Sequence, residues 1–176
     1  MTPKDQPPKR PESEGRYRPN VGIVVFNRHG QVWLGRRAKT LSSQNWQFPQ
    51  GGIDSGEEPL AAARRELLEE TGIHSVTLLA RAPGWISYDF PVGAQGTKVS
   101  KGFRGQVQAW FAFHFDGEDA EVNLAFTEHQ EFDAWRWANI DEAIELVAHF
   151  KRDAYIKVIE AFTWSTRPLK ASITLT

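Results

Sequence analysis

Residues 51–73 read GGIDSGEEPLAAARRELLEETGI, and this stretch carries the strongest structural signal in the chain. Pro59 suits the first turn of a helix, and Gly72 suits the position that follows the last turn. The sequence therefore predicts a helix over residues 59–71. The side of this helix that we expect to pack inward carries Leu60, Ala63, Leu67 and Thr71.

The opposite side of the predicted helix is acidic. Glu66, Glu69 and Glu70 lie three and four positions apart, and like charges at this spacing destabilise a helix by about 0.2–0.5 kcal/mol per pair. The ordinary interpretation is a solvated face that Arg64 and Arg65 partly neutralise. A divalent cation would reverse the sign of the effect, because carboxylate oxygens are ligands that suit Mg²⁺ or Mn²⁺. The sequence therefore predicts a candidate metal site here.

The same stretch resembles the Nudix box, G-x5-E-x7-R-E-U-x-E-E-x-G-U, in which U is a bulky aliphatic residue. Every fixed position is met, by Gly51, Glu57, Arg65-Glu66-Leu67, Glu69-Glu70 and Gly72-Ile73. The resemblance implies an α/β protein with the Nudix fold, an α/β/α sandwich with a mixed β-sheet. It also implies an enzyme that hydrolyses a nucleoside diphosphate linked to another group.

The resemblance further implies roles for individual residues. In this family the divalent metals, Mg²⁺ or Mn²⁺ here, are bound by glutamates that correspond to Glu66, Glu69 and Glu70. Gly51 would let the backbone approach the metal and phosphates closely, because glycine has no side chain. The arginine that corresponds to Arg65 typically orients the glutamate that corresponds to Glu57.

Four stretches outside the box narrow the resemblance to one branch of the family. They are YRPNVG (17–22), WQFPQGG (46–52), EFDAWRW (131–137) and FKRD (150–153). That branch contains bacterial RNA pyrophosphohydrolases and dinucleoside polyphosphate hydrolases. Two substrates follow: the 5′ triphosphate or diphosphate end of RNA, whose conversion to a monophosphate initiates mRNA decay, or a dinucleoside polyphosphate such as diadenosine tetraphosphate. A non-catalytic nucleotide- or RNA-binding module is disfavoured, because all the box glutamates are present.

This branch adds five residues to the candidate site. The glutamate that corresponds to Glu131 reaches the metal cluster in relatives, so Glu70, Glu66 and Glu131 are all open as the proton acceptor. Contacts with the 5′ end of RNA are implied for Arg18, Arg37, Phe150 and Lys151. Taken alone, arginines beside a strand are usually solvated. The predicted helix start at Lys151, however, is a position where the helix dipole disfavours cations, which hints at an anionic partner.

Several other positions bear on the substrate. Trp85 and Tyr88 are candidates for stacking on a base. Relatives often have a lysine at the position of Ala109, so one phosphate contact would be missing, and Ala148 would alter the pocket for a second nucleotide. Positive charge from the loop over residues 92–104 would compensate, through Lys98, Lys101 and Arg104.

Outside the box, apolar runs and turn residues predict the remaining elements. Strands are expected at 21–26, 31–36, 46–49, 76–82, 84–90, 106–115 and 132–137, and helices from Asp141 to about 149 and over about 151–164. The acidic stretch 116–121 reads as a solvated turn. We expect a disordered leader over residues 1–16, a Nudix hydrolase domain over 17–164 and a C-terminal tail over 165–176.

Composition excludes several classes of protein. The chain has 176 residues, a formal charge of -1 and no cysteine, which excludes a globally basic nucleic-acid binder, thiol catalysis and cysteine-ligated metal. The five histidines show no spacing typical of zinc ligands. No apolar run approaches the roughly 20 residues that span a bilayer. These features predict a cytoplasmic protein with no membrane partner.

Overall fold

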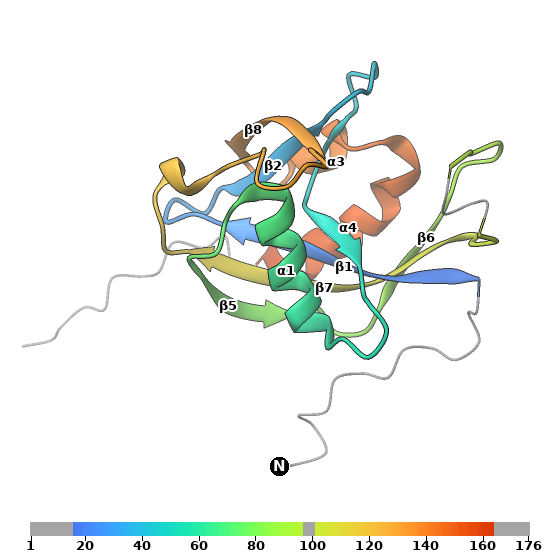
Figure 1. The fold of residues 1–176 in the computed structure, drawn as a ribbon, viewed down its shortest axis with the longest axis horizontal. Coiled ribbons are helices and arrows are strands. Elements are labelled where there is room, and N and C mark those ends of the chain that lie inside the picture. The colour runs from blue at the N-terminus through green and yellow to red at the C-terminus, as the bar shows by residue number, and fades with distance from the viewer. Residues whose placement is uncertain (1–15, 97–100, 164–176) are drawn as a thin grey trace, which may run out of the picture.

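Two strands from distant parts of the chain form the centre of the sheet. The computed structural model describes residues 16–96 and 101–163. In it, β1 (Tyr17–Phe26) runs parallel to β7 (Gly105–Phe115) along its whole length (Figure 1). The other strand pairs are antiparallel. The sheet is therefore mixed, which confirms the predicted fold class.

The remaining strands extend the sheet on both sides of this pair. They are β2 (Val32–Arg37), β3 (Trp46–Gln47), β4 (Gln50–Gly52), β5 (Val76–Arg81), β6 (Ile86–Asp89) and β8 (Phe132–Ala138). The main strand order is β3-β2-β1-β7-β5, while β4 pairs with β1, β6 with β7 and β8 with β2. Because β7 occupies one edge of β1, β2 and β4 share the other edge.

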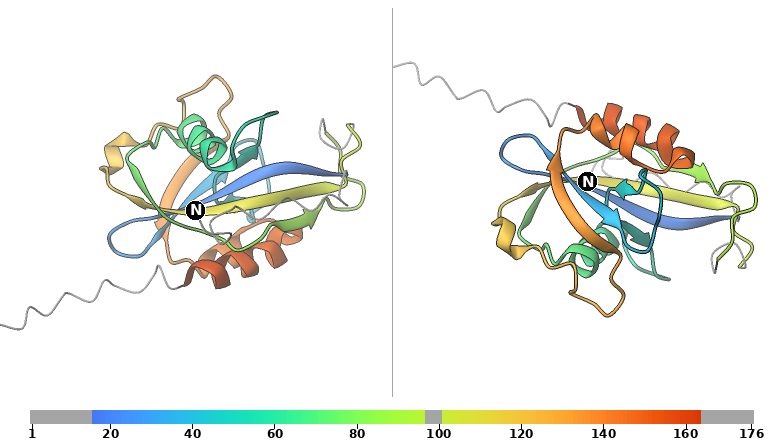
Figure 2. Two further views of the ribbon diagram at one scale, coloured as in Figure 1. Left: turned by 90° about the horizontal axis from the view of Figure 1, so that it is seen from below. Right: turned by 90° about the horizontal axis from the view of Figure 1, so that it is seen from above.

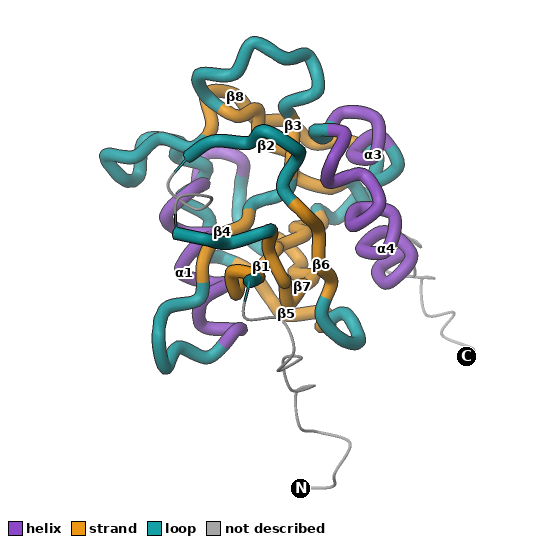
Figure 3. The backbone as a smooth tube through the Cα atoms, turned by 90° about the vertical axis from the view of Figure 1, so that its right-hand side faces the viewer, coloured by secondary structure: helices purple, strands orange, loops and turns teal. Residues whose placement is uncertain are grey.

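Helices cover both faces of the sheet (Figures 2 and 3). One face carries α1 (Pro59–Thr71), and the other carries α3 (Glu142–Leu146) and α4 (Arg152–Phe162). Residues of β1 alternate between the two cores, as a strand requires: Val21, Ile23 and Val25 pack with the α1 side, and Val24 and Phe26 with the α4 side.

The helix predicted from the box is confirmed to the residue. α1 begins at Pro59 and ends at Thr71, and Gly72 follows with a φ of 74°, which glycine adopts without strain. The Gly72 N–H donates a 2.9 Å hydrogen bond to the Leu68 carbonyl and closes the helix. Leu67 and Thr71 are fully buried, as the pattern predicted.

The C-terminal helices differ from the prediction. The helix expected from Asp141 to about 149 ends at Leu146, because Val147 is extended and fully buried in the α4-side core. A 3₁₀ turn, η3 (His149–Lys151), then leads into α4. The Asp141 side chain makes no capping hydrogen bond.

Two further expectations need correction. β1 begins at Tyr17, not at residue 21, so Arg18 lies within the strand. The acidic stretch after β7 is not simply solvated, since it contains the 3₁₀ turn η2 (Asp119–Glu121). The half-buried Glu121 carboxylate accepts hydrogen bonds from the backbone N–H groups of His74 and Ser75. This carboxylate therefore fixes the segment that joins α1 to β5.

Parts of the prediction fall outside the described residues. These parts are Lys98, the leader as far as residue 15 and the tail from residue 165. None of the helices within residues 16–96 and 101–163 is long and apolar enough to cross a membrane.

Candidate active site

The acidic side of α1 faces the backbone of β4. A side chain at Gly51 would overlap the Glu66 carboxylate, and one at Gly52 would overlap the Arg18 guanidinium. The two glycines therefore allow a carboxylate and an arginine to lie directly against the strand. Burial raises the pKa of Glu66, which the positive charge of Arg65 opposes.

Arg65 organises one end of this acidic cluster. Its guanidinium binds both oxygens of Glu57, with Nε–Oε1 at 2.8 Å and Nη2–Oε2 at 2.9 Å, and Nη2 also donates to the Gly52 carbonyl at 2.8 Å. Nη1 lies 2.9 Å from Glu66 Oε1 and 3.3 Å from Glu69 Oε2. The hydrogen bond from Arg65 and a backbone N–H lower the pKa of Glu57 to about 2. Glu57 is therefore ionised at neutral pH.

The surroundings of Glu70 shift its pKa in the direction opposite to that of Glu57. Its Oε2 accepts a 3.3 Å hydrogen bond from the Gln50 N–H. Burial raises the pKa of Glu70 well above its usual range, and the negative charges of Glu131 and Glu66 raise it further. The ionised form of Glu70 is therefore disfavoured at this position.

Glu131 reaches this cluster from a distant part of the chain. Its backbone carbonyl accepts a 2.9 Å hydrogen bond from the Ala38 N–H, where the pairing of β2 and β8 is irregular between Arg36 and Arg37. An irregularity of this kind changes the direction of side chains. The Glu131 carboxylate lies 3.6 Å from Arg37 Nε.

A pocket of about 460 Å³ opens beside Glu131. Of the predicted residues, it is lined by Arg37, Tyr88, Glu131, Phe150 and Lys151. Sequence reasoning did not assign a role to the other polar residues of its floor, which are Gln47, Gln50 and Gln106. One signal was present: Gln106 and Gln108 are polar residues on one side of a buried strand, and a buried amide requires hydrogen-bond partners.

Lys151 supplies a buried cation to the pocket. It is 4% exposed, and its Nζ donates to Gln47 Oε1 at 3.0 Å and to Gln50 Oε1 at 3.5 Å. The same Nζ lies 5.7 Å from the ring centres of Tyr88 and Phe150. Amide oxygens and aromatic rings therefore hold this ammonium group at the pocket, and its positive charge also acts on Glu70.

The buried amides form a connected network below the pocket. Gln108 Nε2 donates to Asn20 Oδ1 at 2.7 Å, and its Oε1 accepts from Trp110 Nε1 at 3.1 Å. The Tyr88 hydroxyl donates to Gln106 Oε1 at 3.0 Å. β1 and β7 thus hold the pocket floor through side chains as well as through backbone pairing.

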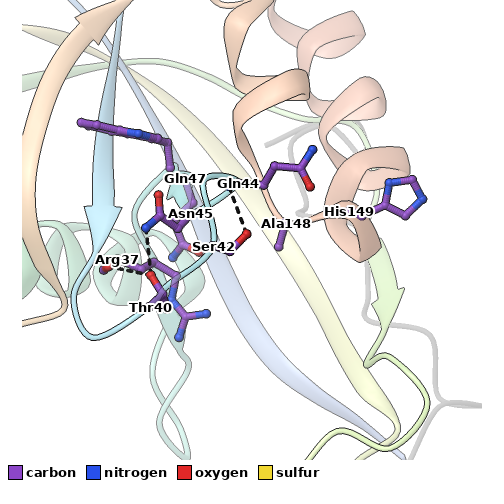
Figure 4. A pocket seen from close by; sticks show the side chains of 9 residues that line it. Arg37, Thr40, Ser42, Gln44, Asn45, Gln47, Ala148 and His149 are labelled. Carbon is purple, nitrogen blue, oxygen red and sulfur yellow. Dashed lines mark hydrogen bonds between the residues drawn. The ribbon is translucent and has the colours of Figure 1, made fainter.

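A second, smaller pocket of about 250 Å³ adjoins the first (Figure 4). Arg37 and Gln47 line both pockets, and Ala148 and His149 lie on the far side of the second. The loop after β2 forms the near side and is held by hydrogen bonds from Asn45 Nδ2 to Thr40 Oγ1 and from Thr40 Oγ1 to the Arg37 carbonyl. Ala148 therefore lines a pocket beside the large one, and its effect on a second nucleotide stays a prediction.

Some predicted residues lie elsewhere. Trp85 packs against the α1-side core with the Arg81 guanidinium 5.6 Å from its ring, so it does not line either pocket. Ala109 is fully buried in the same core, on the face opposite Gln106, and lines neither pocket, so its expected effect on a phosphate contact stays a prediction. Arg104 pairs with Asp89 at 2.9 Å.

The donor set suits a hard divalent cation. The candidate ligands are carboxylates, and burial and the charges of Glu131 and Glu66 disfavour the ionised form of Glu70, which a bound cation would favour. Within residues 16–96 and 101–163, no three acidic or histidine side chains are already arranged as a metal site. Arg65 and Arg37 instead lie within ion-pair distance of Glu66, Glu69 and Glu131.

The chain is similar to known proteins over most of its length. The family model for the NUDIX domain matches residues 16–162. An RNA pyrophosphohydrolase of Caulobacter vibrioides is 55% identical over 148 residues, covering 84% of this chain and 86% of that protein. One from Rhizobium meliloti is 49% identical over 160 residues, covering 86% and 96%.

Solved structures with low sequence identity share the fold. The E. coli dihydroneopterin triphosphate pyrophosphohydrolase matches with a TM-score of 0.63 at 20% identity, over 82% of this chain and 97% of that chain. A C. elegans Ap4A hydrolase matches with a TM-score of 0.56 at 18% identity, over 82% and 98%. These likenesses concern the fold alone.

Proposed function

The chain belongs to the Nudix family, and we propose that it is an RNA pyrophosphohydrolase. Such an enzyme hydrolyses the 5′ triphosphate or diphosphate end of RNA to a 5′ monophosphate, which would initiate mRNA decay. Relatives that bear this name are about half identical to the chain over most of both sequences. An RNA substrate also supports a cytoplasmic location.

The observation that carries the proposal is the pocket beside the acidic cluster. It joins a buried cation, Lys151, and an arginine, Arg37, to an aromatic side chain, Phe150. Cations bind phosphate groups, and exposed aromatic faces stack on the unpaired bases of single-stranded RNA. Arg18, which lies against Gly52 near Glu66, would add a second cation beside the polyphosphate.

Nudix hydrolases typically depend on divalent metal, and we propose Mg²⁺ or Mn²⁺ for this chain. The residues that would hold it are the backbone of Gly51 and the carboxylates of Glu66, Glu69, Glu70 and Glu131. When bound, the cation would offset phosphate charge and lower the pKa of a water molecule.

The remaining catalytic roles would fall to side chains of the acidic cluster. Glu70 is our choice for the proton acceptor, because its carboxylate lies against β4, where it accepts a hydrogen bond from the Gln50 N–H, and a positioned carboxylate can serve as a general base. The water oxygen would bond to phosphorus, and the bond to the bridging oxygen would break. The products would be 5′-monophosphate RNA and pyrophosphate or phosphate.

Arg65 and Glu57 would act by positioning other residues of the site. Their bidentate pair and the Arg65 bond to the Gly52 carbonyl tie the loop before α1 to β4. This tie would hold Gly51 and Glu66 in register, and it keeps Arg65 between Glu66 and Glu69.

A dinucleoside polyphosphate hydrolase is the second candidate. Two adjoining pockets share Arg37 and Gln47, and each would accept one nucleoside of such a substrate. The acidic cluster and its chemistry would be the same.

The decisive experiment gives the protein both substrates in parallel. The protein is incubated with Mg²⁺ or Mn²⁺ and either 5′-triphosphate RNA or diadenosine tetraphosphate, and the released phosphates are identified. A higher kcat/KM for RNA supports the proposal. A higher value for the dinucleotide favours the second candidate, and hydrolysis of neither substrate would contradict both.

A further inference from the structure

Arg37 lies where the two parts of the candidate site meet. Its Nε is 3.6 Å from Glu131 Oε1, and both side chains are about two-fifths exposed, at 42% and 41%. The same arginine lines the large pocket and the smaller second pocket. Glu131 lines the large pocket, and its charge acts on Glu70.

The Arg37–Glu131 pair competes with both proposed ligands of the site. A cation held by Glu131 withdraws the carboxylate from Arg37 and repels the guanidinium, since like charges in contact are unfavourable. An RNA phosphate or base held by Arg37 likewise withdraws the guanidinium from Glu131. Within the described ranges 16–96 and 101–163, Glu131 is the one carboxylate within ion-pair distance of Arg37.

The backbone around the pair is fixed, so the exchange needs only side-chain movement. The Ala38 N–H binds the Glu131 carbonyl at 2.9 Å, and β2 pairs with β8 on both sides of the irregularity at Arg36 and Arg37. Half-exposed side chains change rotamer quickly compared with backbone rearrangements.

We propose that Arg37 couples cation binding at the acidic cluster to nucleic-acid binding in the pockets, by exchanging partners with Glu131. This inference rests on the proposed function, because it needs a cation at Glu131 and an RNA ligand at Arg37. Cation binding frees Arg37 for RNA, and by reciprocity RNA binding frees Glu131 for the cation.

The strand provides a matched control. Arg36, the preceding residue, pairs with Asp133 at 2.7 Å, and the exposed fractions of these two side chains, 46% and 43%, are close to those of the Arg37 pair. Arg36 lines neither pocket. An Arg36→Met variant therefore removes the same charge from the same strand without removing the proposed competitor.

The first measurement is the affinity for Mn²⁺ without RNA, from the electron paramagnetic resonance signal of free Mn²⁺. An exposed ion pair changes an equilibrium by at most about fivefold, so Arg37→Met should bind Mn²⁺ about two- to fivefold more tightly than the wild type. Arg36→Met should stay within about 1.5-fold of the wild type on the same scale. Equal effects of the two variants, or none, would overturn the coupling.

The second measurement follows the Arg37 Nε–H resonance by ¹⁵N NMR. Saturating Mg²⁺ should shift this resonance in the wild type and leave that of Arg36 in place. The Glu131→Gln variant without Mg²⁺ should show Arg37 near its Mg²⁺-loaded position, because its partner charge is gone. An Arg37 resonance that responds neither to Mg²⁺ nor to the Glu131→Gln substitution would refute the exchange. Hydrolysis of 5′-triphosphate RNA is assayed separately, so the proposed function can stand while this inference fails.

Discussion

The guanidinium of Arg65 grips both carboxylate oxygens of Glu57 at 2.8 and 2.9 Å, while its other nitrogens reach the Gly52 carbonyl, Glu66 and Glu69. One side chain thus joins the loop before α1, the helix itself and β4. Hydrogen bonds between charged groups are roughly twice as strong as those between neutral groups.

Loss of Arg65 should destabilise the protein. Arg65→Met leaves the carboxylates of Glu57, Glu66 and Glu69 without their shared cation, at a cost of about 2 kcal/mol in the free energy of unfolding. Urea denaturation measures this change. The adjacent Arg64 is exposed and contacts only the Phe113 ring among the interactions found in the described residues, at 5.1 Å, so Arg64→Met should cost less than about 1 kcal/mol. Similar losses in the two variants would contradict the organising role of Arg65.

Replacement of Glu70 should have opposite effects on stability and on activity. Its pKa is raised in the folded protein, so the ionised form is disfavoured there, and stability is lost as pH rises from 4.5 through the folded pKa. Glu70→Gln removes this charge and should raise the thermal stability of the metal-free protein at pH 7. The same change should lower turnover by about 10²–10⁴ if Glu70 is the general base.

Glu69→Gln is the matched control for that prediction, because Glu69 is a neighbouring glutamate with a side chain 42% exposed. Its removal should leave metal-free stability nearly unchanged. Turnover close to wild type in Glu70→Gln would reject Glu70 as the proton acceptor.

Glu57 should contribute to stability in the opposite direction. Its pKa falls from 4.5 to about 2 on folding, so its contribution is complete above about pH 4.5 and is lost as the pH falls toward 2. The difference in unfolding free energy between the wild type and Glu57→Gln should therefore shrink across this range. A difference that stays constant from pH 5 to 2.5, measured by urea denaturation at each pH, would exclude the ion pair as its source.

Lys151 should act on RNA phosphate through its charge. Lys151→Met keeps much of the buried stem, so the fold should persist, but one phosphate contact is lost. For single-stranded RNA, the slope of log Kd against log salt should fall by about 0.7. Fluorescence anisotropy with 5′-triphosphate RNA and Ca²⁺ in place of the active metal would measure it. The exposed Lys157 on α4 is the control, and an equal change of slope there would reject the specific contact.

Local signals were sufficient for α1 and not for the pocket. Pro59 and Gly72 mark the two ends of the helix by backbone chemistry that any tertiary context retains, and both ends were predicted correctly. The direction of the acidic side chains followed from helical periodicity. The contact of Glu66 with Gly51 depends on the pairing of β4 with β1, which periodicity does not encode.

The substrate side of the site is non-local. Arg37, Glu131 and Lys151 come from β2, the segment before β8 and the turn before α4. Only the family resemblance brought them together before the structure did. The burial of Lys151 ran against the usual exposure of lysine, and it depends on Gln47 and Gln50, which read as ordinary strand residues. Trp85 shows the limit of local reasoning, because its position in the sequence does not reveal which face of the sheet it joins.

The hydrogen bond between Gln108 and Asn20 joins positions 88 residues apart, and the parallel pairing of β1 with β7 has the same span. Such contacts form late, because a long loop must close before they can. A chain emerging from the ribosome presents the complete acidic helix well before β7 has been synthesised. The pocket also needs Glu131, Phe150 and Lys151, which follow β7 in the chain, so half-made copies carry Glu66, Glu69 and Glu70 without the cavity that selects what they act on.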